Sequence, residues 1–267
     1  MLFVVGTPIG NLKDISLRAL EVLEQVDIVA CEDTRNTLKL LNHYKLKKKL
    51  ISYHKFNEKE KSEEIVLLLQ EGKKVALVSD SGMPIISDPG NILIKLLKKN
   101  NLEYTVIPGA SAGISALILS AFESKMFTFV GFLPQKNVER VNLLNSLKNL
   151  THTLIFYISP HSLIKDTQTL FEIFGERNAC FVKEITKIHE TVYDFVLGQE
   201  VDINLKGEFV LIVEGTSETI VEKEYLSIDE QIQTLKAQGL TENQAISKTA
   251  KQNNMTKQDL YKILKVK

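Results

Sequence analysis

The chain has 267 residues, 33 basic and 33 acidic side chains, and a hydrophobic content of 44%, as is typical of a globular protein of one large or two ordinary domains. The zero net charge argues against a protein that coats nucleic acid non-specifically, and no apolar segment approaches the roughly 18 residues of a membrane span. The two cysteines, Cys31 and Cys180, exclude a disulfide framework, and neither they nor the five histidines have metal-ligand spacing.

The apolar start of the chain, "MLFVVGTPIGN", has no basic leader. Together with the two cysteines, it predicts a protein of the reducing cytoplasm, without a structural metal and without a membrane anchor.

The first 120 residues alternate short apolar runs with helix-length periodic segments. Strands are predicted at 2–5, 27–31, 50–54, 75–79 and 104–109, and helices at 15–26, 36–44, 59–71, 90–99 and from Ser111. The spacing of Leu17, Leu20, Leu23 and Val26 predicts one buried helix face, with Asp14 as the helix cap. The repeat predicts an α/β fold with an open, mainly parallel sheet that is covered on both faces.

Residues 121–216 predict a second, mixed α/β domain with more strand. Its strands are expected at 127–134, 152–159, 178–198 and 207–215, with helices around Leu143–Leu150 and 161–173. Residues 217–228 are predicted to form a polar linker. Residues 229–267 predict a helical, helix-turn-helix-like extension, with Ala245, Ala250, Leu260 and Ile263 turned inward.

This extension holds seven lysines against four acids. RNA phosphate contact is one interpretation of its positive charge. A packing or dimer-stabilising appendage is the other.

The five predicted strands of the first half end in small and polar residues. The strand ends and the turns after them are "GTPIGN" (6–11), "EDTR" (32–35), His54, "SDSGMP" (79–84) and "PGASA" (108–112). Because the carboxyl ends of parallel strands share one edge, these turns predict a small-molecule site there. Neither the dinucleotide nor the P-loop fingerprint is present. Asp80 among exposed backbone groups favours a ligand with hydroxyls and a positive centre, and the helix start at "PGASAG" can receive a carboxylate. S-adenosylmethionine combines these features.

Six motifs then occur in order: "GTPIGNLKDISLRALEVLE…EDTRNT", "SDSGMPIISDPG", "PGASAGISAL", "FVGFLPQK", "KEITKIHET" and "GEFVLIVEG". Over residues 3–215 the chain resembles the tetrapyrrole methylase superfamily, the class III S-adenosylmethionine-dependent methyltransferases. Within it, the chain most resembles the branch that 2′-O-methylates a cytidine of 16S ribosomal RNA, which also carries a small C-terminal helical extension. The resemblance implies two α/β domains with the cofactor between them, a homodimer, and 16S rRNA of the small ribosomal subunit as partner.

The resemblance also implies cofactor contacts at particular positions. They are Pro8 after the first strand, Asp80, Gly82 and Met83 around the ribose and methionine portions, Ser111 and Ala112 in the "PGASA" turn, and Tyr157 in the second domain. The chain departs from the branch at four positions, since it has Ser81, Met83, Ile158 and Ser162 where Ala, Thr, Glu and Arg are usual. The last two departures remove an acid and an arginine from residues 157–162, and with them the contacts to cofactor or RNA that these side chains would make.

Methyl transfer needs an aligned acceptor oxygen and a route for its proton. One candidate group follows the second strand and comprises Glu32, Asp33 and Arg35; the other comprises Glu184, Lys187, His189 and Glu190. We expect Lys187 and Glu190 first, as residues that shape the acceptor site. A helix cap with a salt bridge is the alternative for the first group, and the solvated face of an edge strand for the second.

Two other functions remain open from the sequence. One is a class III methyltransferase that acts on a tetrapyrrole, against which the helical extension and the "GTPIGN" and "EDTR" motifs count. The other is a non-catalytic RNA-binding factor of ribosome assembly, which the altered segment 157–162 favours and the intact turns oppose. Binding of S-adenosylmethionine separates enzyme from scaffold, and the methyl acceptor separates the two enzymes.

Overall fold

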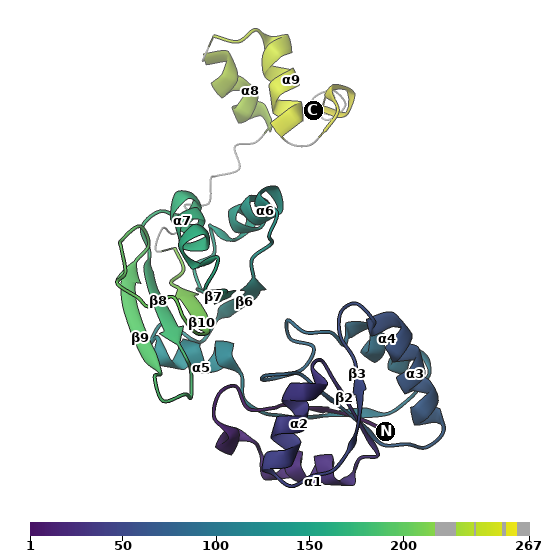
Figure 1. Ribbon diagram of the computed structural model, residues 1–267. Helices are drawn as coiled ribbons and strands as arrows, with labels where there is room; N and C mark the ends of the chain where they lie inside the picture. Colours follow the sequence, from purple (N-terminus) through teal and green to yellow (C-terminus); the bar gives the residue numbers. More distant parts are fainter. Residues whose placement is uncertain (217–227, 238, 253–254, 261–267) are drawn as a thin grey trace. The chain divides into compact units, whose positions relative to one another are not determined.

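A computed structural model describes residues 1–216, 228–237, 239–252 and 255–260 (Figure 1). The chain divides into two compact units, Met1–Thr216 and Ser217–Lys267. The first unit holds two five-stranded sheets, which confirms the α/β class. The predicted domain boundary at residue 120 stays a prediction. The predicted linker lies outside the described residues except for Ile228, which begins a helix.

The first sheet is entirely parallel and has the strand order β3-β2-β4-β1-β5. Its strands are β1 (Leu2–Val5), β2 (Ile28–Cys31), β3 (Lys49–Ser52), β4 (Val75–Val78) and β5 (Tyr104–Ile107). Every residue of β2 and β4 is buried. Continuous apolar runs are expected for strands that are covered on both faces.

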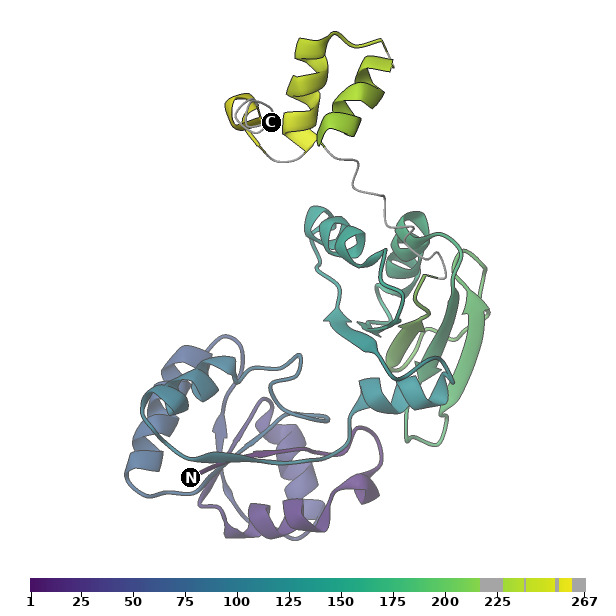
Figure 2. The same ribbon diagram turned by 180° about the vertical axis from the view of Figure 1, so that it is seen from behind.

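Helices cover both faces of this sheet (Figures 1 and 2). Residues of α1 (Leu17–Gln25) and α2 (Thr34–His43) pack in one core cluster with Val29 and Val78. Residues of α3 (Glu58–Gln70) and α4 (Asn91–Lys99) pack in another with Leu2 and Leu77. A short 3₁₀ helix, Leu12–Asp14, precedes α1. All five predicted strands form, and so do all five predicted helices, the fifth as α5 (Ala112–Leu119), with boundaries shifted by at most two residues where both ends were predicted.

The prediction for the start of α1 is wrong in two respects. Ser16 caps the helix instead of Asp14, because its hydroxyl accepts the Ala19 amide at 3.1 Å. Leu17 is 78% exposed, although Leu23 and Val26 are buried. At 3.6 residues per turn, a series spaced by three drifts around the helix, and Leu17 points about 160° away from Ala19. The buried face therefore runs through Ala19 and not through Leu17.

The second sheet is mixed and has the order β6-β7-β10-β8-β9, in which only β6 and β7 are parallel. Its strands are β6 (Phe127–Phe132), β7 (Thr153–Ile158), β8 (Asn178–Lys183), β9 (Thr191–Val196) and β10 (Phe209–Val213). One face packs against α6 (Asn137–Leu147) and α7 (Leu163–Phe174). The other packs against α5 (Ala112–Leu119).

The stretch 178–198 is a hairpin instead of one long strand. Residues 184–190 connect β8 to β9, and within them Glu184 and Thr186 have φ of 53° and 65°. These left-handed conformations are incompatible with an extended strand. Lys187 and Glu190 therefore lie in a connection, which contradicts the alternative that they occupy the solvated face of an edge strand.

The second unit contains α8 (Ile228–Ala237) and α9 (Glu242–Gln252). Its core comprises Ile232, Leu235, Ala245, Ile246, Ala250 and Leu260. Burial of Ala245, Ala250 and Leu260 confirms the inward face predicted for them, while Ile263 lies outside the described residues. Within the part of the chain that the structure describes, no helix is long and apolar enough to span a bilayer.

Candidate functional site

Three loops at the carboxyl edge of the first sheet are joined to one another. The Thr7 amide donates to the Gly82 carbonyl at 2.9 Å, and the Gly82 amide donates to the Thr7 carbonyl at 3.2 Å. A Cβ on Gly6 would lie 2.7 Å from the Cα of Gly109, so only glycine allows this approach. The loops after β1, β4 and β5 therefore form one rigid rim.

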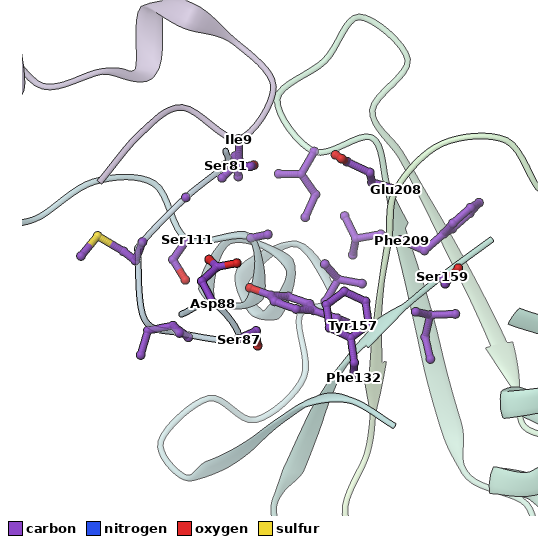
Figure 3. Close-up of a pocket in the computed structure, with 18 of the residues that line it drawn as sticks. Ile9, Ser81, Ser87, Asp88, Ser111, Phe132, Tyr157, Ser159, Glu208 and Phe209 are labelled. Carbon is purple, nitrogen blue, oxygen red and sulfur yellow. The ribbon is translucent and has the colours of Figure 1, made fainter. Parts of the chain in front are cut away.

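Beside this rim lies a cavity of about 480 Å³, within the range of small-molecule sites (Figure 3). The loops after β1, β4 and β5 line it on one side, and the second sheet lines it on the other. Its lining comprises Ile9, Ser81, Gly82, Met83, Ile86, Ser87, Asp88, Ser111, Ala112, Phe132, Tyr157, Ile158, Ser159, Pro160, Val182, Ile185, Glu208, Phe209 and Val210.

Five of the seven predicted cofactor residues line this cavity: Gly82, Met83, Ser111, Ala112 and Tyr157. Pro8 and Asp80 do not, although Ile9, next to Pro8, does. Asp88 and Glu208 were not among the residues predicted from the sequence. Asp88 stands near the end of the motif "SDSGMPIISDPG", but nothing in the sequence distinguished it from a turn residue. Glu208 precedes β10 and reaches the cavity only through the fold.

Of the ionisable side chains that the structure describes, the cavity is lined by the carboxylates Asp88 and Glu208 and by Tyr157, and by no lysine or arginine. Four serines supply hydroxyls. The ring of Tyr157 meets those of Phe129 and Phe132 edge to face, with centroids 5.1 and 5.4 Å apart. Such a site suits a ligand with a positive centre, hydroxyls and a flat ring.

Asp88 is half-buried at the cavity wall. Burial, together with the smaller effect of the negative charges of Glu32 and Asp80, raises the pKa of its carboxyl to about 6. Figure 3 shows the Tyr157 hydroxyl directed toward Asp88. Burial also raises the pKa of Tyr157. A hydrogen bond with the Gly113 backbone lowers this pKa and the negative charge of Asp88 raises it, but burial is the largest effect.

Asp80 connects two neighbouring loops instead of lining the cavity. Its carboxylate accepts the Asp33 amide at 3.1 Å and the Asn36 side-chain amide at 2.9 Å. β2 and β4 are adjacent, and the chain leaves them in opposite directions, toward β3 and β5, which makes this a switch point of the sheet. A cofactor contact by Asp80 stays a prediction.

The "EDTR" residues have structural partners outside the cavity. Asp33 is the N-cap of α2, where it accepts the Arg35 amide at 2.8 Å, and it forms an ion pair with the Arg35 guanidinium at 2.7 Å. Hydrogen bonds from Arg35 lower the Asp33 pKa to about 2. The geometry matches the alternative of a cap with a salt bridge. Glu32 is half-buried and acts on the cavity through its charge near Asp88.

Lys187 and Glu190 hold the connection between β8 and β9 at the cavity. The Lys187 ammonium lies 3.0 Å from both Glu184 and Glu208, and Glu190 accepts the Thr186 amide at 2.6 Å. Burial lowers the Lys187 pKa, but the two ion pairs outweigh it and the net shift is upward. Lys187 therefore stays charged at neutral pH and is a poor proton acceptor there.

The same connection packs closely on the loop after β1. A Cβ on Gly10 would lie 2.7 Å from the Ile185 carbonyl oxygen and 2.7 Å from Cγ of Lys187. Ile185 and Glu208 line the cavity. A shaping role for Lys187 is consistent with these contacts, whereas His189 is exposed and does not line the cavity.

Three of the four departures from the branch pattern, Ser81, Met83 and Ile158, line the cavity. Ser162 precedes α7, and its hydroxyl donates to the Ser159 carbonyl at 3.3 Å. The Ile158 side chain is buried in the core cluster that includes residues of α6 and α7. In the described residues, no group of three or more His, Cys, Asp or Glu side chains is arranged to hold a metal.

Two solved structures share this fold. A uroporphyrin-III-C-methyltransferase from Thermus thermophilus matches with a TM-score of 0.58 and 19% identity, over 80% of this chain and 93% of that one. A diphthine synthase matches with a TM-score of 0.64 and 16% identity, over 80% and 89%. Residues 1–200 match the family model of Tetrapyrrole (Corrin/Porphyrin) Methylases. The chain belongs to the tetrapyrrole methylase family.

Several relatives of higher identity carry the name ribosomal RNA small subunit methyltransferase I. The protein from Halalkalibacterium halodurans is 39% identical over 98% of this chain and 93% of its own length. The Bacillus subtilis protein is 36% identical over 100% and 94%, and the Mycoplasmopsis pulmonis protein 48% identical over 79% and 96%. Within the tetrapyrrole methylases, this chain is thus most like that group, as its motifs predicted.

Proposed function

We propose that the protein is an S-adenosylmethionine-dependent methyltransferase that 2′-O-methylates the ribose of a cytidine in 16S rRNA, within the small ribosomal subunit and in the cytoplasm. The observation that carries the proposal is the cavity of about 480 Å³ that the three joined loops form with the second sheet. The relatives' shared name supports RNA of the small subunit as the substrate.

The cavity suits S-adenosylmethionine by its chemistry. Two carboxylates without a lining lysine or arginine favour the sulfonium and ammonium charges over a triphosphate. Tyr157 and Phe132 offer ring faces and edges to a purine. The start of α5 beside Ser111 and Ala112 presents backbone amides for the carboxylate of the methionine portion.

The bound cofactor supplies an electrophilic methyl group on a sulfonium sulfur. The chain contributes orientation, because the loop contacts at Thr7, Gly82 and Gly109 fix the wall against which the reacting groups align. Such positioning can supply roughly 7–11 kcal/mol of the acceleration. Lys187 and Glu190 shape the acceptor side by fixing the connection that carries Ile185.

The second unit is the proposed RNA contact outside the cavity. Residues 229–267 carry an excess of positive charge in a chain of zero net charge. The described helices α8 and α9 bury an apolar core, and their lysines Lys236 and Lys248 are exposed outside it, where they can contact phosphate oxygens.

Methyl transfer from radiolabelled S-adenosylmethionine to small ribosomal subunits that lack the modification tests the proposal. Nucleoside analysis of the RNA is expected to place the label in 2′-O-methylcytidine. Label in a base or in another nucleoside would contradict the acceptor. Cofactor binding with no label on RNA would contradict the ribosomal substrate and favour a tetrapyrrole acceptor, and absence of cofactor binding would leave only a scaffold function.

We also propose a homodimer, on the basis of exposed apolar side chains at α5 and the edge strand β6. Ile114 and Ile118 of α5 and Phe127 and Phe129 of β6 are all exposed. The two elements touch, since the Phe129 ring lies 3.3 Å from the Cβ position of Gly113. An apolar surface beside an open strand edge is a common site of association, and a second copy of the chain is its proposed occupant.

Ile118, which is 73% exposed, gives a test of this interface. Ile118→Glu is expected to convert a dimer to a monomer in sedimentation experiments, because a carboxylate cannot be buried without a partner. Leu67→Glu on α3 is the matched control, since Leu67 is also exposed but lies on another helix. Its mass is expected to remain that of the wild type, and a dimeric Ile118→Glu protein would contradict the proposed surface.

A further inference from the structure

The reaction proposed above releases a proton that the site must accept. A bond forms between the ribose oxygen and the methyl carbon, and the carbon–sulfur bond breaks with its electron pair going to sulfur. The hydroxyl proton must then leave the oxygen. A carboxylate beside the cavity with a pKa near neutrality can take it, and general-base catalysis of this kind contributes roughly 10²–10⁴-fold.

Among the carboxylates near the cavity, most are already engaged. Asp33 is bound to Arg35, and its pKa of about 2 makes it a weak base. Glu208 pairs with Lys187 at 3.0 Å, and Asp80 accepts two hydrogen bonds from the loop after β2. Within the described part of the chain, the structure records neither an ion pair nor a hydrogen bond for the Asp88 carboxylate.

The backbone around Asp88 fixes where its carboxylate lies. Ser87 has a left-handed φ of 69°, and Pro89 restricts the conformation of the residue before it. Gly90 is held by its amide, which donates to the Glu58 carboxylate at 2.8 Å. A loop so constrained holds the side chain at the cavity wall instead of letting it turn to solvent.

The charged and titratable groups around Asp88 come from several elements. Glu32 after β2 and Asp80 after β4 act on it as negative charges, and the Tyr157 hydroxyl of β7 faces it (Figure 3). Glu208 lines the same cavity. The like charges and the burial keep Asp88 more basic than an ordinary carboxyl, yet ionised above pH 6.

We propose that Asp88 is a catalytic residue, the general base that accepts the proton of the acceptor hydroxyl as the methyl group is transferred. The inference rests on the proposed function. It assigns a role to a residue that lines the cavity and that the motifs alone did not predict.

Asp88→Asn tests the proposal, because it keeps the shape of the side chain and removes the proton acceptor. With small ribosomal subunits as substrate, the single-turnover rate is expected to fall about 10²–10⁴-fold. The Kd for S-adenosylmethionine, measured by calorimetry, is expected to rise by about tenfold at most, because Asp88 supplies one of the two carboxylates that line the cavity and Glu208 remains. Asp88→Glu should restore part of the rate. Asp202→Asn, the same change at an exposed residue, is the control and should match the wild type.

Two pH measurements sharpen the test. The wild-type rate is expected to rise with pH through about 6, where Asp88 ionises, and Asp88→Asn should lose this limb. Without cofactor or RNA, the variant should melt at a higher temperature than the wild type above pH 6 and at a similar one near pH 4. The sign follows because the raised pKa makes the native state bind more protons than the unfolded chain between these values, so wild-type stability falls as pH rises.

Each outcome decides the proposal. An Asp88→Asn protein with wild-type rate would overturn the role of Asp88 and leave the proposed function intact. Loss of S-adenosylmethionine binding by this variant would make Asp88 a cofactor contact instead of a base. A wild-type protein that binds the cofactor but methylates no RNA would overturn the proposed function, and the inference with it.

Discussion

Gly109→Ala is expected to weaken S-adenosylmethionine binding at least about tenfold, which corresponds to about 1.4 kcal/mol. A Cβ at this position would lie 2.9 Å from the Cα and 2.9 Å from the carbonyl carbon of Gly6. Both are backbone atoms that no side-chain rotation can move away. The loops after β1 and β5 must therefore separate, and the cavity wall moves with them. The strain is expected to cost about 1–3 kcal/mol of unfolding free energy.

Gly72→Ala is the matched control for this change. Gly72 has φ of +84° and nothing within 4 Å of its Cβ position, so alanine costs about 1–2 kcal/mol of backbone strain without a steric contact. Calorimetry should give wild-type cofactor affinity for this variant, and urea unfolding should show a comparable loss of stability. If both variants lost affinity equally, general destabilisation would explain the effect and the close approach of the loops would not.

Arg140→Met is expected to lower the free energy of unfolding by about 3–5 kcal/mol, because it leaves the Asp166 carboxylate buried without its cation. The two side chains are 5% and 7% exposed and lie 3.3 Å apart. Arg140 also donates to the carbonyls of Pro134 and Gln135. The residue thereby ties α6 to α7 and to the loop after β6. Urea unfolding monitored by circular dichroism measures the change.

Two further variants separate burial from charge. Lys136→Met removes the exposed ion pair with Glu139, whose side chains are 80% and 56% exposed, and should cost less than about 1 kcal/mol. The double variant Arg140→Met with Asp166→Leu should recover most of the loss, because neither charge is then left alone. A double variant as unstable as Arg140→Met would show that the carbonyl contacts of Arg140 dominate.

The spacing of apolar residues was enough to predict the α/β fold. β2 and β4 are continuous apolar runs because helices cover both faces of their sheet, and such runs are visible without coordinates. The spacing was not enough for details that depend on rotation about a helix axis or on local backbone. Leu17 points away from the core although its spacing fits an apolar series, and the strand-like run 178–198 folds back at two left-handed residues.

The sequence likewise predicted some features of the candidate site and not others. Gly82, Ser111 and Ala112 stand in loops at strand ends, and parallel strands bring such loops to one edge by geometry alone. The motifs in those loops also indicated the family that the comparisons show. The sequence by itself thus determined the class of protein, the edge of the sheet that carries the site and several of the residues there.

Only the tertiary structure decided which polar side chains face the cavity. Asp33 and Asp88 are both acids in loops that follow a strand. Arg35 forms an ion pair with Asp33, whereas Asp88 is half-buried beside Tyr157 and its pKa is raised. Glu208 reaches the cavity, and Lys187 is held beside it, because β10 and the β8–β9 connection meet. Partners and burial of this kind arise between segments far apart in the chain, so local sequence carries no signal for them.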